Sequence, residues 1–234
     1  MKIKTLPGDK KAVVLLSGGL DSATTLFLAR KRGFRCFCLV FDYGQRHQRE
    51  IGSAKKIARF AHCAYRLIKL RFPWKGSALL DRKSKIPAAT GYRLQARSVI
   101  PNTYVPARNT VFLSLALAYA EAINAGAIFI GANAVDFSGY PDCRPEFYRA
   151  FKKVAACATK SGVEGKKIRI ETPLIEKSKA EIIRLGASLG VPFQWTWSCY
   201  AGKNKPCAQC DSCYLRAKGF RQAKIKDPLL GISK

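Results

Sequence analysis

The fold of this chain is decided by the stretch Ala12-Val13-Val14-Leu15-Leu16-Ser17-Gly18-Gly19-Leu20-Asp21-Ser22. Its first five residues are apolar and partly β-branched, which is typical of a short buried strand. The paired glycines permit a tight turn, and the composition of residues 23–30 favours a helix. The stretch therefore predicts a strand, a loop and a helix in succession. Such a loop suits a phosphate group, because its amides and the helix N-terminus both attract an anion. The alternative is an ordinary glycine turn in which Asp21 caps the helix.

Outward from this stretch, apolar strands and helices alternate. We expect strands at residues 36–41, 65–70, 127–131 and 167–171, and helices at residues 45–60, 109–125, 146–160 and 178–189. The last helix opens with a capping box, Ser178-x-x-Glu181. Segment 71–106 contains several prolines and predicts loops and short helices. This alternation predicts an α/β fold, a Rossmann-like open parallel sheet with helices on both faces. We expect a catalytic domain over residues 1–194 and a small C-terminal module over 195–234.

The composition is that of a globular protein, with 48% hydrophobic and 24% charged residues in a chain of 234. No stretch reaches eighteen consecutive apolar residues, so we expect no membrane span and no membrane partner. The N-terminal residues contain no apolar segment of the kind found in secretory signals, so we expect a cytoplasmic protein. Disulfides are not expected in that compartment.

The chain is strongly basic, with 42 Lys and Arg against 15 Asp and Glu and a net charge of +27. The Lys and Arg residues are spread along most of the sequence, although residues 110–143 contain neither. Two interpretations remain open, a basic composition without a specific partner and a surface for polyanions. We favour the first and expect no specific nucleic-acid partner.

Four cysteines gather near the C-terminus: Cys199, Cys207, Cys210 and Cys213. Two-residue spacings allow neighbouring thiolates to converge on one tetrahedral ion. Four soft ligands suit either zinc or an iron–sulfur cluster. The sequence therefore predicts a metal site in the C-terminal module.

Further polar segments follow the predicted strands, and we expect them at the carboxyl edge of the sheet, where ligands bind. Asp42 is expected either to cap the next helix or to contact a ribose. Arg108, before the helix at 109–125, is expected to contact phosphate or a substrate carboxylate. Tyr140 offers a flat face to a heterocycle, and Asp142 could accept two N–H donors from a guanine-like edge. Lys179, on pattern alone, is a surface lysine.

The hexapeptide at residues 17–22 resembles the fingerprint of the PP-loop ATP pyrophosphatases, and it lacks the Gly-Lys-Ser/Thr of a Walker A loop. Together with segments 42–47, 105–110, 138–147 and 197–200, it makes residues 12–220 similar to the 7-cyano-7-deazaguanine synthase family. One departure is Ala107, where the family leads us to expect glycine.

This resemblance implies a fold like that of the adenine nucleotide alpha hydrolases and a ligase of queuosine biosynthesis. It would use ATP and Mg²⁺ to adenylate 7-carboxy-7-deazaguanine, free ammonia to form the amide, and a second ATP to form the nitrile. It implies structural Zn²⁺ on the four cysteines and a homodimer. The residues implied as catalytic are Ser17, Asp21, Arg108 and Lys179. Those implied for the nucleotide are Ser17, Gly18, Gly19, Leu20, Asp21, Ser22, Asp42 and Tyr43. Those implied for the substrate are Arg108, Asn109, Asp136, Tyr140 and Asp142. Asp21 is the candidate to hold Mg²⁺ or to orient the loop.

The alternative function is a tRNA-modifying PP-loop enzyme of the thiolation or lysidine type. The basic segment 216–226 would then be a phosphate-binding surface. The sequence has no evident separate RNA-binding domain, which favours the first hypothesis. A non-catalytic zinc-bearing nucleic-acid module would leave residues 17–22 unexplained.

Overall fold

A five-stranded parallel sheet forms the centre of the computed structural model, which describes residues 10–81, 83–86, 88, 100–135, 139–201 and 204–229. The strands are β1 (Lys11–Leu15), β2 (Arg35–Asp42), β3 (Ala64–Lys69), β4 (Ala127–Ile130) and β5 (Arg169–Glu171). Their order is β3-β2-β1-β4-β5, and all neighbouring strands are parallel. The chain therefore winds outward from β1 in one direction and then in the other, which confirms the doubly wound α/β fold.

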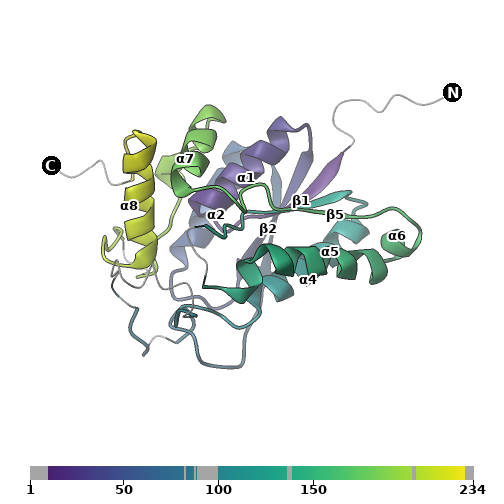
Figure 1. The fold of residues 1–234 in the computed structure, drawn as a ribbon, viewed down its shortest axis with the longest axis horizontal. Helices are drawn as coiled ribbons and strands as arrows, with labels where there is room; N and C mark the ends of the chain where they lie inside the picture. The colour runs from purple at the N-terminus through teal and green to yellow at the C-terminus, as the bar shows by residue number, and fades with distance from the viewer. Residues whose placement is uncertain are drawn as a thin grey trace.

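Helices cover both faces of this sheet (Figure 1). One face carries α1 (Leu20–Lys31), α2 (Arg49–Phe60), α7 (Lys179–Ser188) and α8 (Asp211–Ala223). The other face carries α4 (Arg108–Ala122) and α5 (Pro145–Cys157), and the short α6 (Lys160–Val163) follows α5. Two 3-10 turns, η1 (Pro141–Cys143) and η2 (Phe193–Trp195), lie in the connections.

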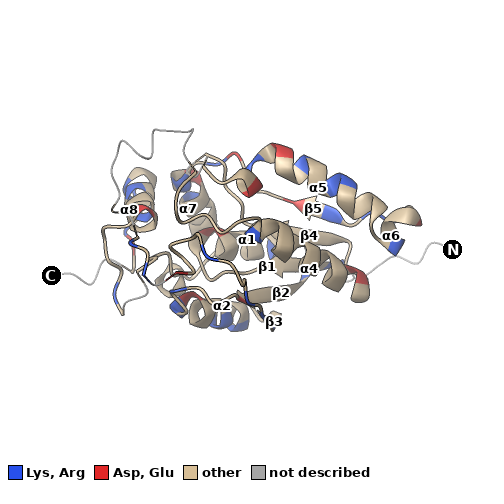
Figure 2. Ribbon diagram, turned by 90° about the horizontal axis from the view of Figure 1, so that it is seen from below, with Lys and Arg blue, Asp and Glu red and all other residues tan. Residues whose placement is uncertain are grey.

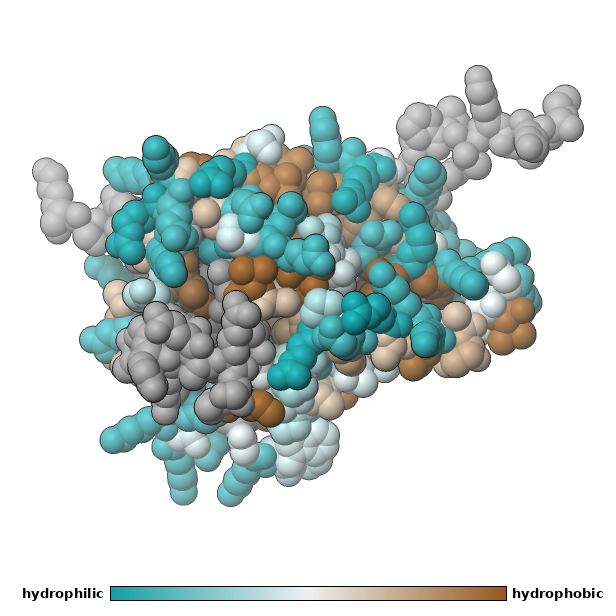
Figure 3. All heavy atoms as spheres, in the orientation of Figure 1, coloured by the Kyte–Doolittle hydropathy of each residue, from teal (hydrophilic) through white to brown (hydrophobic). Residues whose placement is uncertain are grey.

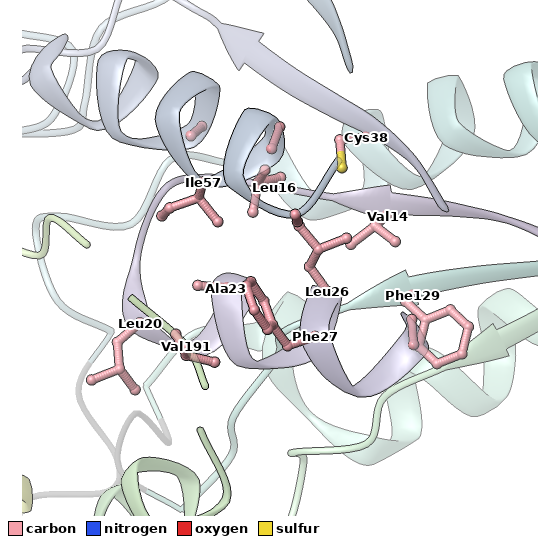
Figure 4. Packing of buried hydrophobic residues seen from close by; sticks show 14 of the residues in the cluster. Val14, Leu16, Leu20, Ala23, Leu26, Phe27, Cys38, Ile57, Phe129 and Val191 are labelled. Carbon is pink, nitrogen blue, oxygen red and sulfur yellow. The ribbon is translucent and has the colours of Figure 1, made fainter. Parts of the chain in front are cut away.

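The alternating side chains of β1 divide the core into two layers. Val14 packs with Leu26 and Phe27 of α1, as Figure 4 shows, whereas Val13 faces α4. Both valines are fully buried. After Lys11, which begins the strand, the β1 side chains from Ala12 to Leu15 are apolar and pack into one or the other of these layers, as expected for the centre of a parallel sheet.

Most predicted elements are present, with shifted ends. Helix α2 starts at Arg49, not at Gln45, because the Gln45 side chain bonds to the backbone of Phe41 and Tyr43 and holds a turn there. The capping box is confirmed: Ser178 Oγ accepts the Glu181 N–H, and Glu181 Oε2 accepts the Ser178 N–H.

Helix α8 was not predicted, because our interpretation of that part of the sequence rested on the spacing of its cysteines. In the expected loop region, the described residues between 71 and 106 form turns and an isolated bridge from Ala88 to Cys210. Within the described chain, no helix has both the length and the apolar character needed to cross a membrane.

Lysine and arginine residues lie on several elements, including α2, α5, α7 and α8, rather than on one (Figure 2). The face shown in Figure 3 is mostly hydrophilic, with smaller hydrophobic areas between the charged side chains. The absence of a specific nucleic-acid partner stays a prediction.

Candidate active site

A cavity of about 300 Å³ opens at the carboxyl edge of the sheet. It lies beyond the carboxyl ends of β1 and β4, where the strand order reverses, which is the position at which open α/β sheets bind ligands. Ten of the residues implied by the resemblance line it: Ser17, Gly19, Leu20, Asp21, Ser22, Tyr43, Arg108, Asn109, Tyr140 and Lys179. The cavity therefore joins the glycine loop to the segments expected to bind the substrate.

The glycine loop packs so tightly that two positions have no room for a side chain. Gly18 has φ of +85°, and a Cβ there would lie 2.7 Å from Ala54 N. A Cβ on Gly131, at the end of β4, would lie 2.9 Å from Ser22 N. Ser22 Oγ accepts the Ser17 N–H and donates to Gly19 O, at 3.2 and 3.0 Å. No side chain caps α1 at Gly19, so the first amides of this helix remain available to an anion.

Lys179 is paired with Asp21 at the edge of the loop. Its Nζ lies 2.9 Å from Oδ1 and 2.8 Å from Oδ2 of the carboxylate. The Lys179 side chain is only 15% exposed, so it is not the surface lysine that its pattern suggests. Gly219 of α8 packs closely against the aliphatic part of the Lys179 side chain. A Cβ at position 219 would overlap the lysine Cγ, so this close packing requires glycine. Helices α7 and α8 thus hold the lysine over the loop.

Tyrosines and Arg108 form another part of the cavity wall. Arg108 Nη1 donates to Tyr43 Oη at 3.1 Å, and its guanidinium lies 5.6 Å from the centre of the Tyr43 ring. Burial raises the pKa of Tyr43 to about 12, and burial also raises the pKa values of Tyr140 and Tyr200. These phenols therefore stay neutral at physiological pH, and Arg108 contributes a positive charge beside them.

Asp142 is hydrogen-bonded to the start of α4 and is not among the residues that line the cavity. Its Oδ2 accepts the Asn109 N–H at 2.9 Å, and burial raises the pKa of its carboxyl above the usual value although this hydrogen bond opposes the shift. Asp42 accepts the Gly44 N–H at 3.3 Å and lies 3.7 Å from Arg71 Nη1. It therefore stabilises the turn after β2, without capping α2. Contacts of Asp42 and Asp142 with ligands stay predictions, and Asp136 lies outside the described residues.

Two hydrogen-bonded residues that the sequence did not assign, His47 and Glu50, also line the cavity. His47 Nε2 lies 3.1 Å from Glu50 Oε2, and Gln45 Nε2 donates to Glu50 Oε1 at 3.0 Å. The spacing of His47 and Glu50, three residues apart at the start of a helix, is the sequence signal that could have suggested this pair.

Arg216 is a further cavity residue, although the alternative function assigned it to a basic surface. It is 4% exposed, and its guanidinium donates to both oxygens of Asp227, at 2.7 and 2.9 Å. It also donates to Thr196 Oγ1, next to Trp197, whose N–H bonds to Gly18 O. Arg216 is therefore not part of a surface for RNA. It holds the segment of Thr196 and Trp197, which lies against the glycine loop.

The four predicted cysteine ligands converge beside the cavity. Their Sγ atoms all lie within 4.8 Å of one another, and Cys207 and Cys213 are 3.9 Å apart. Tetrahedral Zn–S bonds of about 2.3 Å would separate sulfurs by roughly 3.8 Å, so the donor set fits zinc. Backbone N–H groups of Ala201 and Cys207 point to Cys199 Sγ, as amides do around thiolates. These four cysteines form a candidate metal site.

Comparisons with known proteins agree with this arrangement. The family model described as "Queuosine biosynthesis protein QueC" matches residues 11–224. A protein named 7-cyano-7-deazaguanine synthase from Anaeromyxobacter sp. (strain Fw109-5) is 52% identical, over 96% of this chain and 97% of that protein. One of the same name from Trichodesmium erythraeum is 51% identical, over 94% and 100%. A 7-cyano-7-deazaguanine synthase 2 from Desulfitobacterium hafniense is 54% identical, over 94% and 92%. Similarity of this degree over almost the whole length means that the chain belongs to the QueC family of queuosine biosynthesis enzymes.

Proposed function

We propose that the chain is an ATP-dependent ligase that converts 7-carboxy-7-deazaguanine and ammonia into 7-cyano-7-deazaguanine. One observation carries the proposal: in a member of the QueC family, a single cavity joins an anion-binding loop to an arginine- and tyrosine-lined wall. The first part suits the phosphates of ATP, and the second suits a flat heterocycle that bears a carboxylate. A tRNA-modifying activity is not favoured by the family match.

The loop end of the cavity would hold the pyrophosphate part of ATP. The amides after Gly19 and the hydroxyl of Ser17 are the donors, and Lys179 is the nearby cation. These groups stabilise the charge that develops on pyrophosphate as it leaves. Asp21 is our candidate to hold Mg²⁺, which would screen phosphate charge when it is bound. Its carboxylate already holds Lys179, so the loop and both charged groups are positioned together.

The opposite wall would hold the substrate. Arg108 would pair with the carboxylate, and Tyr140 offers its ring face to the heterocycle. Asn109 and Asp142 are bonded to each other, so we propose that they shape this wall as one unit. Adenylation is needed because a carboxylate oxygen is a poor leaving group, whereas AMP is a good one.

We propose that Cys199, Cys207, Cys210 and Cys213 bind structural Zn²⁺. Loss of this zinc would affect the cavity, because the lining residues Ser198, Tyr200 and Ser212 are each next to a cysteine ligand in the sequence. We keep the division into a catalytic domain, residues 1–194, and a zinc module, residues 195–234. Contacts such as the one from Trp197 N–H to Gly18 O join the two parts.

We also propose a cytoplasmic homodimer without a specific nucleic-acid partner. Size-exclusion chromatography with light scattering tests the dimer. Binding of tRNA is expected to be weak, insensitive to sequence and steeply reduced by salt. Tight binding at physiological salt that distinguishes tRNA species would contradict this part of the proposal.

The activity is tested by incubating the zinc-loaded protein with ATP, Mg²⁺, ammonium and 7-carboxy-7-deazaguanine. We expect the nitrile by mass spectrometry, with AMP and pyrophosphate as the nucleotide products. An Arg108→Gln variant should show weaker use of the carboxylate substrate, because its cation is lost. A fully folded, zinc-loaded protein that releases ADP and phosphate, or makes no nitrile, would contradict the proposed function.

A further inference from the structure

His47 has one ring nitrogen whose hydrogen-bonding capacity is unused. The residue is 3% exposed, and its Nδ1 is buried without a hydrogen-bond partner among the described residues. Its other nitrogen, Nε2, is bonded to Glu50. Buried polar atoms are almost always paired, because an unpaired one gives up its hydrogen bond to water without a replacement. Nδ1 is therefore left with the capacity for one hydrogen bond that the described residues do not use.

A chain of hydrogen bonds fixes the protonation pattern of the His47 ring. Gln45 Oε1 accepts the Tyr43 N–H at 2.8 Å, and Gln45 Nε2 donates to Phe41 O and to Glu50 Oε1, each at 3.0 Å. This leaves Glu50 Oε2 to accept from His47. Because an ionised carboxylate only accepts hydrogen bonds, the proton of neutral His47 is on Nε2. Nδ1 then carries a free lone pair and is an acceptor.

The pair of His47 and Glu50 also lies at the cavity that we propose as the active site. His47 and Glu50 line the same cavity as Asp21 and Arg108. The centre of the His47 ring is 5.7 Å from that of Tyr200, which lines the cavity too. An imidazole oriented by a carboxylate, beside a substrate cavity, is the arrangement by which enzymes position a general base.

We propose that His47, oriented by Glu50, is the general base that removes protons from the reacting nitrogen. The inference rests on the proposed function and deepens it. In the first stage, ammonia attacks the adenylated carboxyl carbon and forms a C–N bond. His47 Nδ1 takes a proton from this nitrogen, the C–O bond to AMP breaks, and the primary amide remains.

The second stage uses the same base. The amide oxygen attacks the α-phosphate of a second ATP and displaces pyrophosphate. His47 Nδ1 takes one N–H proton and releases it to solvent. Loss of the remaining N–H proton, with cleavage of the C–O bond to AMP, then gives the nitrile. No oxidant or reductant is required. Adenylation itself removes no proton from nitrogen, so it does not need His47.

The test compares His47→Gln with wild type in two assays. The first is isotope exchange between pyrophosphate and ATP with 7-carboxy-7-deazaguanine and no ammonium, which reports adenylation alone. The second is the formation of amide and nitrile with ammonium. We expect exchange within about threefold of wild type, and product formation lower by about 10²–10⁴-fold, the usual contribution of a general base. Glu50→Gln should show the same division, because a glutamine side chain can donate to Nε2 and move the ring proton to Nδ1.

A matched control is available because the chain has only two histidines. His62 is exposed at the end of α2, and His62→Asn should leave both assays unchanged. Imidazole added to His47→Ala should restore part of the product formation, which a purely structural role would not allow. Zinc content and melting temperature check the fold of each variant.

Wild-type product formation by His47→Gln would overturn the inference, and so would parallel loss of exchange and product formation. A failure of the proposed function is distinguishable, since the wild-type protein would then form no nitrile.

Discussion

Lys179 Nζ lies within 2.9 Å of both carboxylate oxygens of Asp21, a pair separated by 158 positions in the chain. Asp21 belongs to the first turn of α1, and Lys179 to the first turn of α7. The pair therefore joins the N-termini of two helices at one edge of the glycine loop. Two helix dipoles and a lysine favour an anion there, and the carboxylate keeps the lysine in position.

Replacing Asp21 with alanine should remove most of the adenylation activity. The lysine would lose its partner, and the candidate Mg²⁺ ligand would be lost. Removal of a well-placed electrostatic group typically lowers kcat by about 10²–10³-fold. Pyrophosphate release, measured with the acid and then with the amide as substrate, should fall in both cases. Glu146→Gln, on the exposed start of α5, is the control and should retain wild-type rates. If the Asp21→Ala enzyme keeps its adenylation activity, Asp21 is not a catalytic residue.

Replacing Cys210 with serine should lower zinc content and thermal stability together. Structural zinc contributes folding free energy directly, and Cys210 is both a candidate ligand and the N-cap of α8. Cys157→Ser is the matched control, because Cys157 is exposed and outside the cluster. Metal analysis and calorimetry measure the two quantities. Unchanged zinc content and melting temperature in Cys210→Ser would exclude this residue as a ligand.

Replacing Ala107 with glycine should stabilise the protein. Ala107 precedes α4 with φ of +51°, in the left-handed region where a Cβ is crowded. The substitution relieves this strain, whereas the greater conformational entropy of glycine in the unfolded chain opposes the gain. The net effect should be a rise of about 1 kcal/mol in the free energy of unfolding. Ala118→Gly, on the exposed side of α4, should lower it by about 1 kcal/mol. Denaturant titration measures both, and a destabilised Ala107→Gly would show that the alanine methyl contributes to packing.

Ala107 also illustrates how far the sequence alone can be interpreted. Its departure from the expected glycine was visible in the sequence, and the positive φ supplies the physical reason for that expectation. The strands were predicted because buried parallel strands are continuous apolar runs, and the position of the site followed from the loops after them. Local patterns therefore predicted the sheet and the edge at which the cavity opens.

Contacts between distant residues could not be predicted in the same way. Nothing near Lys179 in the sequence indicates that it will pair with Asp21. Arg216 lies in a basic segment, yet it is buried because Asp227 pairs with it and Thr196 accepts a further hydrogen bond. A sequence gives the number and spacing of its charged residues. Whether one of them is buried depends on the partners that the fold brings to it. The pair of His47 and Glu50 is different, because its three-residue spacing is present in the sequence, although the burial of His47 became visible only in the structure.

The nitrile should form in two adenylation steps, with the primary amide as an intermediate. The loop at residues 17–22 has amides for a departing pyrophosphate and lacks the lysine of a Walker A loop, so cleavage between the α- and β-phosphates is expected. Each nitrile should therefore consume two ATP molecules, with two AMP and two pyrophosphate released. Synthetic amide, supplied with ATP and Mg²⁺ but without ammonium, should be converted to nitrile with one AMP per product. Chromatography of nucleotides with mass spectrometry of the deazaguanines measures both ratios. An inert amide, or one ATP per nitrile from the acid, would contradict a mechanism in which the same loop serves both steps.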